Sequence, residues 1–435
     1  MIGHLLAVRK GEDVMSTMTA KKWGGMLCSL VAACALLGSV SEAHAAATVA
    51  SDASGAIIIF PKIIVDTSGR LGPRRDTQIE LTNTSNSVIA ARCYWVEATS
   101  HCSNAPSTPC TLERETNSDT RVCPTGGTCV AQWNEHDFRF TLTKRQPIAF
   151  SAGAGLPDFP LSESRGLGGQ TNNNSDGSPS AIPPVVDDPF FGELKCVEVD
   201  PTDFLPSIGF NPGNNGAGDL AGHATIVTVN DSKVDARKYN GIVLQSTTIN
   251  DRNDTLQIGG PNAEYAGCPN ILILDHFFDN ALVGSHKVAG SFNVQDQVAT
   301  DLTVIPCSED FRLQENNLGG AVLQFLVFNE FEQRFSASTS FTCFKEIQLS
   351  DIDTRIGPND NTKSIFNVNV QGTLSGQTRI RSVINGDEAN GVLGIAERFF
   401  DCSSGPSDTC SSAEDLHWTG TRTQGDQIIL SPDLP

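Results

Sequence analysis

The sequence predicts a mostly β protein of two antiparallel, immunoglobulin-like β-sandwich domains with long loops and little helix. Three observations predict this fold. Apolar and polar residues alternate at period two in many short segments, as half-buried strands require. Glycine (39) and proline (22) are frequent and separate these segments. Only 18% of the 435 residues are charged, which is low for a protein built of long exposed helices.

The first predicted domain spans residues 48–250. Its first strand, 57–65, is almost entirely apolar but contains Pro61, which has no N–H to donate, so we expect it at a sheet edge or at a crossing between sheets. Residues 77–82 and 88–96 flank a polar turn and predict a hairpin. Further short strands are expected at 138–143, 147–150, 194–199, 223–229 and 242–245.

Two insertions interrupt this domain. Residues 99–134 contain four cysteines among many Ser, Thr, Pro and Gly residues, which predicts a disulfide-tied, Cys-rich loop. Residues 151–189 are rich in Gly, Asn and Pro, which predicts a long mobile loop. These two loops are the expected contact regions of the domain.

The second predicted domain spans residues 255–435. Its strongest segment is 321–335, where Phe325, Val327, Phe331 and Phe335 share one face at period two, so we expect one long half-buried strand. Further strands are expected at 270–274, 301–305, 340–344, 365–370, 378–383, 392–397 and 427–430.

Residues 1–45 have the pattern of a signal peptide. Lys21 and Lys22 precede an uncharged apolar stretch at 26–40, and Ala43-His44-Ala45 fits the small-residue cleavage rule. The alternative of a membrane anchor is disfavoured because the apolar run is short for a spanning helix. We therefore expect a secreted or periplasmic protein whose mature chain has no transmembrane span.

A second alternative is attachment to a lipid. Residues 31–34 resemble a lipoprotein cleavage box, which would place the lipid on Cys34 and give a lipid-anchored surface protein. The apolar run continues beyond Cys34 to Leu37, so soluble release is the favoured prediction.

Eleven cysteines lie beyond residue 45, and outside the cytoplasm cysteines usually pair. An odd number leaves at least one cysteine unpaired or bonded to another molecule. Three short loops are plausible, and the connectivity stays open: Cys102–Cys110, Cys123–Cys129 and Cys402–Cys410. Zinc is disfavoured because the sequence has no CxxC pair with matching histidines.

The net charge is strongly negative. Without residues 1–45 the chain keeps 26 basic and 47 acidic residues, a net charge of −21, which would repel a nucleic-acid backbone. Solubility outside a cell is the favoured explanation of this charge, and binding of Ca²⁺ or of a cationic partner is the alternative. The candidate ligands of Ca²⁺ are Asp251, Asn253 and Asp254, with 172–176 and 359–361 as further candidates, although each segment also reads as a plain turn.

No catalytic or cofactor-binding residue is predicted. The sequence has no Gly-x-Ser-x-Gly elbow, no HExxH pair and no P-loop. Asp275, His276, Asp279 and His286 lie close together in the sequence, but acid–base or metal chemistry needs their side chains to converge, and we expect structural roles.

Several stretches carry a resemblance to known proteins: 60–66, 77–84, 92–94, 192–196 and 328–335. In these stretches the chain resembles a group of uncharacterised secreted bacterial β-sandwich proteins, over most of its mature length. The resemblance implies a secreted β protein and implies no activity.

The expected function is a non-enzymatic binding or structural role in the periplasm, at the cell surface or in the medium. The partner would be an extracellular protein or a carbohydrate, bound on strand faces and loops. The alternative is a secreted hydrolase acting on polysaccharide, because a catalytic pair of carboxylates on separate strands leaves no local motif.

Overall fold

The computed structural model describes residues 48–431 with gaps. The gaps are residue 71 and residues 111–122, 131–132, 157–181, 207–217, 231–232, 248–250, 289–291, 313–320, 354–360, 385–386, 389 and 402–408. The predicted signal segment, Cys34, Cys402, most of loop 151–189 and residues 172–176 thus lie outside the described residues. The described part is mostly β, and none of its helices has the length and apolarity to cross a membrane.

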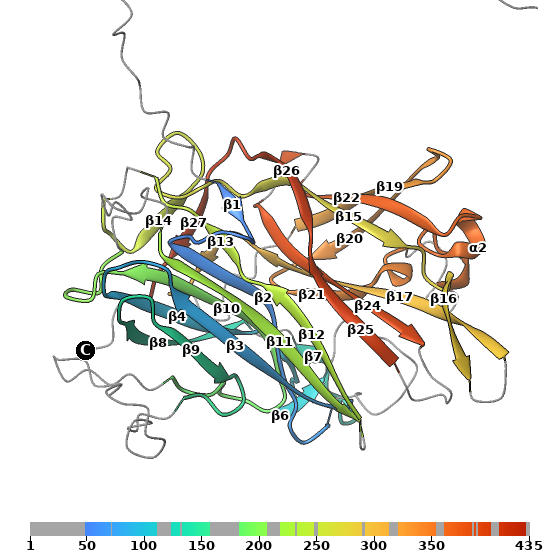
Figure 1. The fold of residues 1–435 in the computed structure, drawn as a ribbon, viewed down its shortest axis with the longest axis horizontal. Helices are drawn as coiled ribbons and strands as arrows, with labels where there is room; N and C mark the ends of the chain where they lie inside the picture. Colours follow the sequence, from blue (N-terminus) through green and yellow to red (C-terminus); the bar gives the residue numbers. More distant parts are fainter. Residues whose placement is uncertain are drawn as a thin grey trace, which may run out of the picture. The chain divides into compact units, whose positions relative to one another are not determined.

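Sheet 1 has six antiparallel strands in the order β1-β13-β2-β10-β4-β8 (Figure 1). Its strands are β1 (Val49–Ala50), β13 (Ile242–Leu244), β2 (Ile57–Val65), β10 (Phe190–Val199), β4 (Ile89–Glu97) and β8 (Asn134–Leu142). Every residue of β2 and β4 is buried, because both faces of sheet 1 are covered. This double burial explains the nearly continuous apolar sequence of 57–65.

β2 lies between β13 and β10, so the expectation of an edge strand is wrong for residues 57–59. Pro61 lies beyond the part of β2 that pairs with β13, where the described strand partner is β10 alone. The register with β10 shifts between Gly192 and Leu194, opposite Ile63 and Phe60, so Pro61 falls in an irregular stretch of the ladder. On the other side, β13 pairs only with 57–59. A proline is tolerated in an interior strand at such a bulge.

Sheet 2 has the order β12-β11-β3-β9 and packs on one face of sheet 1. Its strands are β12 (Lys233–Asn240), β11 (Leu220–Asn230), β3 (Arg74–Asn83) and β9 (Pro147–Ser151). Phe60 and Trp95 from sheet 1 meet Ile79, Leu81 and Ile226 from sheet 2 in one buried core. The alternation predicted for 77–82 is confirmed by the burial pattern of β3. The hairpin predicted for 77–82 with 88–96 is wrong, because β3 pairs with β11 and β9 in sheet 2 whereas β4 belongs to sheet 1.

Sheet 3, with the order β14-β27-β18, contributes to the core on the other face of sheet 1. Its strands are β14 (Thr255–Ile258), β27 (Asp426–Ile429) and β18 (Glu309–Asp310), and the β18–β27 pair is parallel. Ile57 and Tyr94 share this core with Leu256, Phe311 and Ile428, and the rings of Tyr94 and Phe311 stack at 4.0 Å. Residues from both predicted domains therefore build a common core.

Sheets 4 and 5 enclose a third core (Figure 1). Sheet 4 contains β20 (Arg334–Phe341), β19 (Ala321–Asn329), β22 (Ser375–Ile384), β15 (Pro269–Phe277) and β26 (His417–Thr421), with β23 (Asp387–Glu388) on β22. Sheet 5 contains β16 (Leu282–Val288), β17 (Phe292–Pro306), β24 (Val392–Asp401) and β25 (Thr409–Asp415), with β21 (Lys345–Gln348) on β17. Leu274, Phe325 and Ile380 from sheet 4 meet Leu302 and Ala396 from sheet 5.

The single strand expected over 321–335 is wrong, because the segment folds as the hairpin β19–β20. The Asn329 side chain accepts hydrogen bonds from Phe331 N and Gln333 N, both at 3.0 Å, and Glu332 adopts a positive φ of 61°. Local Asx bonding reverses the chain here and leaves Phe331 exposed.

The remaining elements are short. Sheet 6, built within the Cys-rich insertion 99–134, contains β6 (Ala105–Cys110), β5 (Ser100–Cys102) and β7 (Cys129–Val130). The helices are η1 (Leu349–Asp351), η3 (Asn361–Lys363) and α2 (Val368–Gln371). Helix α2 begins after Asn367, whose side chain accepts from Asn369 N, and ends at Gly372 in the left-handed conformation.

Candidate functional site

A groove of about 590 Å³ runs along sheet 4. Residues of β15, β19, β20 and β22 line it, together with the segment that follows η1. The lining residues are Ile271, Gln324, Phe325, Leu326, Arg334, Ser336, Ala337, Ser338, Ile352, Asp353, Arg379, Ile380 and Arg381. A groove of this volume is in the range that holds a small molecule or a short stretch of polymer.

Three exposed arginines dominate the charge of this groove. Arg379 and Arg381 flank the core residue Ile380 on β22, so alternation turns both side chains to the face of sheet 4 opposite the core. Arg334 on β20 pairs with Phe328, which lies on that same face. Within the described residues, none of these three arginines forms an ion pair with a carboxylate.

The hydrogen bonds of the arginines go to neutral side chains. Arg381 Nε donates to Gln324 Oε1 at 3.0 Å, and Arg379 Nε donates to Gln377 Oε1 at 3.3 Å. The guanidinium of Arg379 also lies 6.0 Å from the ring centre of Phe328. The positive charge thus remains available to an anionic ligand, and the fork of an arginine suits a carboxylate or sulfate group.

Among the described residues that line the groove, Asp353 contributes the carboxylate. It is nearly buried, and its Oδ2 accepts a hydrogen bond from Ile365 N at 3.2 Å. This carboxylate is therefore engaged in holding the segment after η1 rather than facing open solvent.

The calcium candidates Asp251, Asn253 and Asp254 lie in the loop that precedes β14. Asn253 N donates to Asp251 Oδ1 at 3.1 Å, and Thr255 N donates to Asn253 Oδ1 at 2.7 Å. Asp254 Oδ1 lies 3.6 Å from Arg92 Nη1. These contacts are those of a turn, and the calcium site stays a prediction.

Asp275, His276 and Asp279 point to different places. Asp275 is exposed, whereas His276 is buried and its ring nitrogens contact Phe277 O at 3.0 Å and Thr378 Oγ1 at 2.8 Å. Burial lowers the pKa of His276 to about 4, so the ring is neutral at pH 7. Asp279 accepts from Thr300 N and Ser350 N, which fits a structural role.

The cysteines of the Cys-rich insertion pair differently from the short loops we considered. The disulfides are Cys102–Cys123 and Cys110–Cys129, so the four predicted cysteines are oxidised but with exchanged partners. Strands β5 and β6 place Cys102 and Cys110 on one small sheet, where each meets a cysteine from further along the chain. Cys410 is also disulfide-bonded.

Two further disulfides join segments of the main sheets. Cys93 and Cys196 face each other across β4 and β10 at a Cα–Cα distance of 4.0 Å, and Cys268 bonds to Cys307. The first of these links residues 103 apart, which no sequence spacing indicated. Cys343 is free and buried, in agreement with the odd cysteine count.

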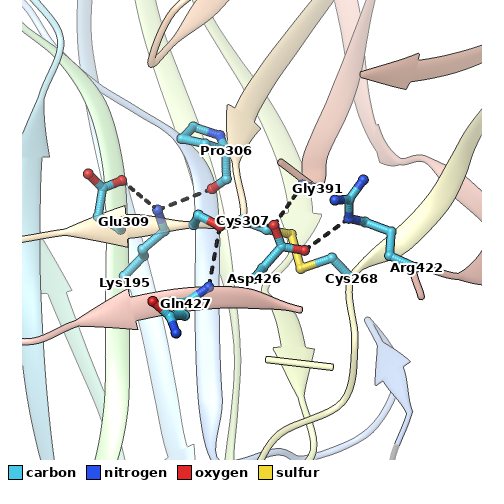
Figure 2. The surroundings of a disulfide bond; sticks show 10 residues. Lys195, Cys268, Pro306, Cys307, Glu309, Gly391, Arg422, Asp426 and Gln427 are labelled. Carbon is cyan, nitrogen blue, oxygen red and sulfur yellow. Dashed lines mark hydrogen bonds and ion pairs between the residues drawn. A yellow bond between two sulfur atoms is a disulfide. The ribbon is translucent and has the colours of Figure 1, made fainter. Parts of the chain in front are cut away.

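A buried lysine lies close to the Cys268–Cys307 disulfide (Figure 2). Lys195 Nζ lies 2.7 Å from Glu193 Oε1 and 3.1 Å from Glu309 Oε2, and both Glu193 and Lys195 are fully buried. Burial acts to raise the pKa of Glu193, and the attraction of Lys195 opposes that shift. Glu193 and Glu309 raise the pKa of Lys195 against the effect of its own burial, so the lysine stays charged and the cluster links β10 to β18.

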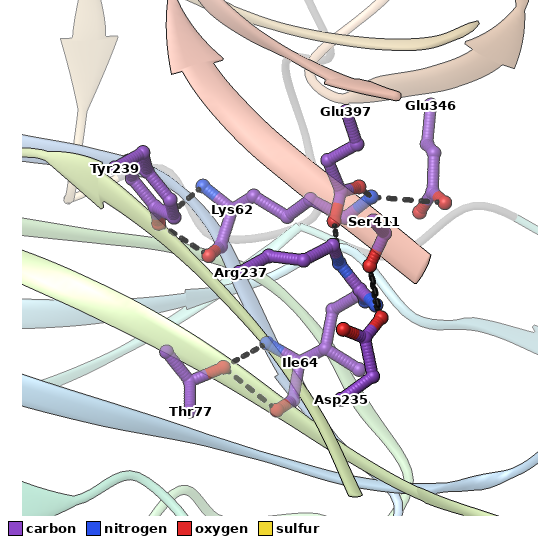
Figure 3. A network of polar contacts seen from close by, with 9 residues as sticks. All are labelled: Lys62, Ile64, Thr77, Asp235, Arg237, Tyr239, Glu346, Glu397 and Ser411. Atoms are coloured by element: carbon purple, nitrogen blue, oxygen red, sulfur yellow. Dashed lines mark hydrogen bonds and ion pairs between the residues drawn. The ribbon is translucent and has the colours of Figure 1, made fainter. Parts of the chain in front are cut away.

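A second buried network connects sheets 1 and 2 with sheet 5 (Figure 3). Glu397 of β24 pairs with Lys62 of β2 and with Arg237 of β12, whose Nε lies 2.7 Å from Glu397 Oε1. Although burial acts to raise the pKa of Glu397, the two cations hold it below its ordinary value. Glu346 Oε1 lies 3.1 Å from Lys62 Nζ; Lys62, Arg237 and Glu397 are buried, and Glu346 is mostly buried. The network fixes the packing of the sheets and offers no access to a substrate.

A third cluster brings Glu97, His101 and Asp187 together. Each offers one potential ligand atom, and these atoms lie within 4.8 Å of one another. Glu97 ends β4, His101 is the middle residue of β5 and Asp187 precedes β10. Sequence reasoning missed this cluster because Glu97 ends a strand while His101 and Asp187 lie in two different insertions, 99–134 and 151–189, which no local pattern brings together.

No protein-family model matches the chain, and no curated protein matches it either. The described residues form a mostly antiparallel β protein with four disulfides and a groove lined by arginines. The arginines were also missed from the sequence, since nothing local shows that β20 and β22 turn their charged residues to one groove.

Proposed function

We propose that the protein is an exported, non-enzymatic binding protein whose ligand is an anionic extracellular carbohydrate. The observation that carries this proposal is the set of Arg334, Arg379 and Arg381 on one groove of a chain whose net charge is −20. A positive groove on a negative protein attracts an anion locally and repels it elsewhere, which directs the ligand to one place.

The export of the chain is supported by its disulfides, because such bonds persist in oxidising compartments outside the cytoplasm. Residues 1–45 would direct export, with release into the periplasm or medium. The packing of sheet 1 on sheet 2, and of sheet 4 on sheet 5, supports the proposal of two β-sandwiches. In this proposal one sandwich face, that of sheet 4, supplies the binding surface as a groove.

A hydrolase needs more than this groove provides. Glycoside hydrolysis uses two carboxyl groups about 5–10 Å apart, one on each side of the bond that breaks. Of the described groove residues, Asp353 alone carries a carboxylate, and three carry guanidinium groups. This composition favours binding of an anion over its hydrolysis.

The experiment is a glycan binding assay with uronate-containing, sulfated and neutral polysaccharides, using the oxidised full chain. The double variant Arg379→Ala/Arg381→Ala should weaken binding of the acidic glycan at least tenfold, because two charge-assisted contacts are lost. Arg312→Ala is the matched control, since Arg312 is half exposed and pairs with Asp310 away from the groove.

Binding should also fall steeply as salt rises from about 50 to 200 mM, since screening weakens exposed charge pairs. Equal binding of neutral glycans, or an unchanged affinity in the double variant, would contradict the proposal. Release of shortened sugar products by the wild-type protein would contradict its non-enzymatic part.

A further inference from the structure

The strongest unassigned feature outside the groove is the cluster of Glu97, His101 and Asp187. Glu97 is 2% exposed and His101 is 7% exposed, whereas Asp187 is open to solvent. Two acids and an imidazole thus meet at a place where Glu97 and His101 are buried and Asp187 reaches solvent.

One buried nitrogen of this cluster lacks a hydrogen-bond partner among the described residues. It is His101 Nδ1, whereas the Glu97 carboxyl group interacts with Thr99 and Asp187. Leaving a buried ring nitrogen without a partner costs free energy, and each such atom in a folded protein calls for an explanation. Imidazole nitrogens are common metal ligands.

The surrounding contacts hold all three side chains in place. Strand β4 fixes Glu97 between β10 and β8, and the Cys102–Cys123 disulfide ties down the residue next to His101. Asp187 is followed by Asp188, whose Oδ1 accepts from Thr67 N at 3.1 Å. The ligand positions are therefore set by a sheet, a disulfide and an anchored loop, which is how a preorganised site is built.

The charges in the cluster also favour a cation. Glu97 and Asp187 place two acidic side chains beside one imidazole, and a divalent ion bound between them would balance both acids.

We propose that Glu97, His101 and Asp187 form a binding site for a divalent transition-metal ion, with Zn²⁺ as the best fit. An imidazole nitrogen beside two carboxylate oxygens suits Zn²⁺ or Mn²⁺, whereas Ca²⁺ prefers six or more oxygen ligands. Three protein ligands and an exposed side leave a further position for water or for a group of a bound molecule.

The site would connect three segments of the chain. It bridges the end of β4, the Cys-rich insertion through β5, and the segment that enters β10. A bound ion would therefore fix β5 against sheet 1, so its effect should be visible in the dynamics of residues 100–102.

The test is titration of the oxidised, metal-free full chain with Zn²⁺ by calorimetry, followed by Mn²⁺ and Ca²⁺. We expect one ion per chain, with Zn²⁺ bound at least tenfold more tightly than Ca²⁺. His101→Gln and Asp187→Asn should each weaken Zn²⁺ binding at least tenfold, because each removes one ligand. His136→Gln on the neighbouring strand β8 is the control, since His136 is exposed and outside the cluster.

Two further measurements keep the test decisive. Co²⁺ should give a visible absorption band that is lost in His101→Gln, and Zn²⁺ should slow amide hydrogen exchange in residues 100–102. Asp187→Asn changes an exposed residue, so its fold should persist even where Glu97→Gln destabilises the protein. Absence of Zn²⁺ uptake by the wild type, or equal uptake by His101→Gln and His136→Gln, would overturn the proposal without touching the arginine groove.

Discussion

At the scale of single residues, the cost of burying charge decides several properties of this protein. Glu198 on β10 is 3% exposed, and its Oε2 accepts a hydrogen bond from Asp219 N at 2.7 Å. The charged group that acts on it is the carboxylate of Asp219. Burial and the charge of Asp219 raise its pKa from 4.5 to about 8. In the folded protein this side chain therefore keeps its proton up to mildly alkaline pH.

Glu198 should make the protein less stable as pH rises. Between pH 4.5 and 8 the folded state binds one more proton than the unfolded state. The free energy of unfolding is therefore highest below pH 4.5, with respect to this group, and falls as the pH rises from 4.5 to about 8. Glu198→Gln keeps an acceptor for Asp219 N and does not ionise. The free energy of unfolding of the variant, relative to that of the wild type, should therefore rise by about 1.4 kcal/mol per pH unit in this window.

Urea unfolding at pH 5, 6, 7 and 8 measures this difference. Glu332→Gln serves as the control because Glu332 is exposed in the turn between β19 and β20. Parallel stability curves for the wild type and Glu198→Gln would show that Glu198 is ionised in the folded protein, contrary to the expectation.

At the scale of elements, the β19–β20 hairpin depends on one side chain. Asn329 accepts two backbone hydrogen bonds within the turn, and its Nδ2 donates to Gln333 Oε1 at 3.0 Å and Gln371 Oε1 at 3.2 Å. Asn329→Ala should lower the free energy of unfolding by about 1–3 kcal/mol, because these bonds are lost and buried groups stay unpaired.

The matched control in this turn is Phe331→Ala. Phe331 is 68% exposed, so its truncation should change the free energy of unfolding by less than about 0.5 kcal/mol. Equal effects of the two substitutions in denaturant unfolding would show that Asn329 does not hold the turn.

The same hairpin shows how far the sequence predicts the elements. The alternation of 77–82 and 325–327 gave the correct strands, because one face of each lies on a core. The reversal at Asn329 was missed because Phe331 and Phe335 continue the period-two pattern, although Phe331 faces solvent. The turn over 329–333 is specified by hydrogen bonds of the Asn329 side chain, and hydrophobic periodicity does not reveal such bonds.

The candidate site was less predictable than the strands. The groove depends on the register of Phe328 with Arg334 across the β19–β20 turn, which the sequence did not predict. It also depends on the register of Leu326 with Arg379, and a register between strands distant in the sequence has no local signal. The interior position of β2 escaped prediction for a related reason, since the bulge that accommodates Pro61 is formed with β10, more than a hundred residues away.

At the scale of the whole molecule, disulfides of different span stabilise the fold to different degrees. Cys93–Cys196 closes 103 residues and Cys102–Cys123 closes 21. In the chain-entropy description, a loop of ~100 residues contributes about 4.7 kcal/mol and a loop of ~20 residues roughly 3 kcal/mol. Cys93→Ala/Cys196→Ala should therefore be less stable than Cys102→Ala/Cys123→Ala.

Guanidinium unfolding of the two double variants, with Cys343→Ser introduced in both to prevent exchange with the free thiol, measures the difference. A larger loss in the Cys102–Cys123 variant would mean that the Cys-rich insertion contributes more to global stability than the central β4–β10 pair does.

The covering of sheet 1 on two sides has a consequence for the order in which the chain matures. β27, which completes sheet 3 over Ile57 and Tyr94, comes from residues 426–429. During synthesis the apolar face of sheet 1 that contains Ile57 and Tyr94 therefore lacks part of its cover until these late residues are made. A chain that ends at residue 400 would lack β27 and would expose apolar surface, which favours aggregation.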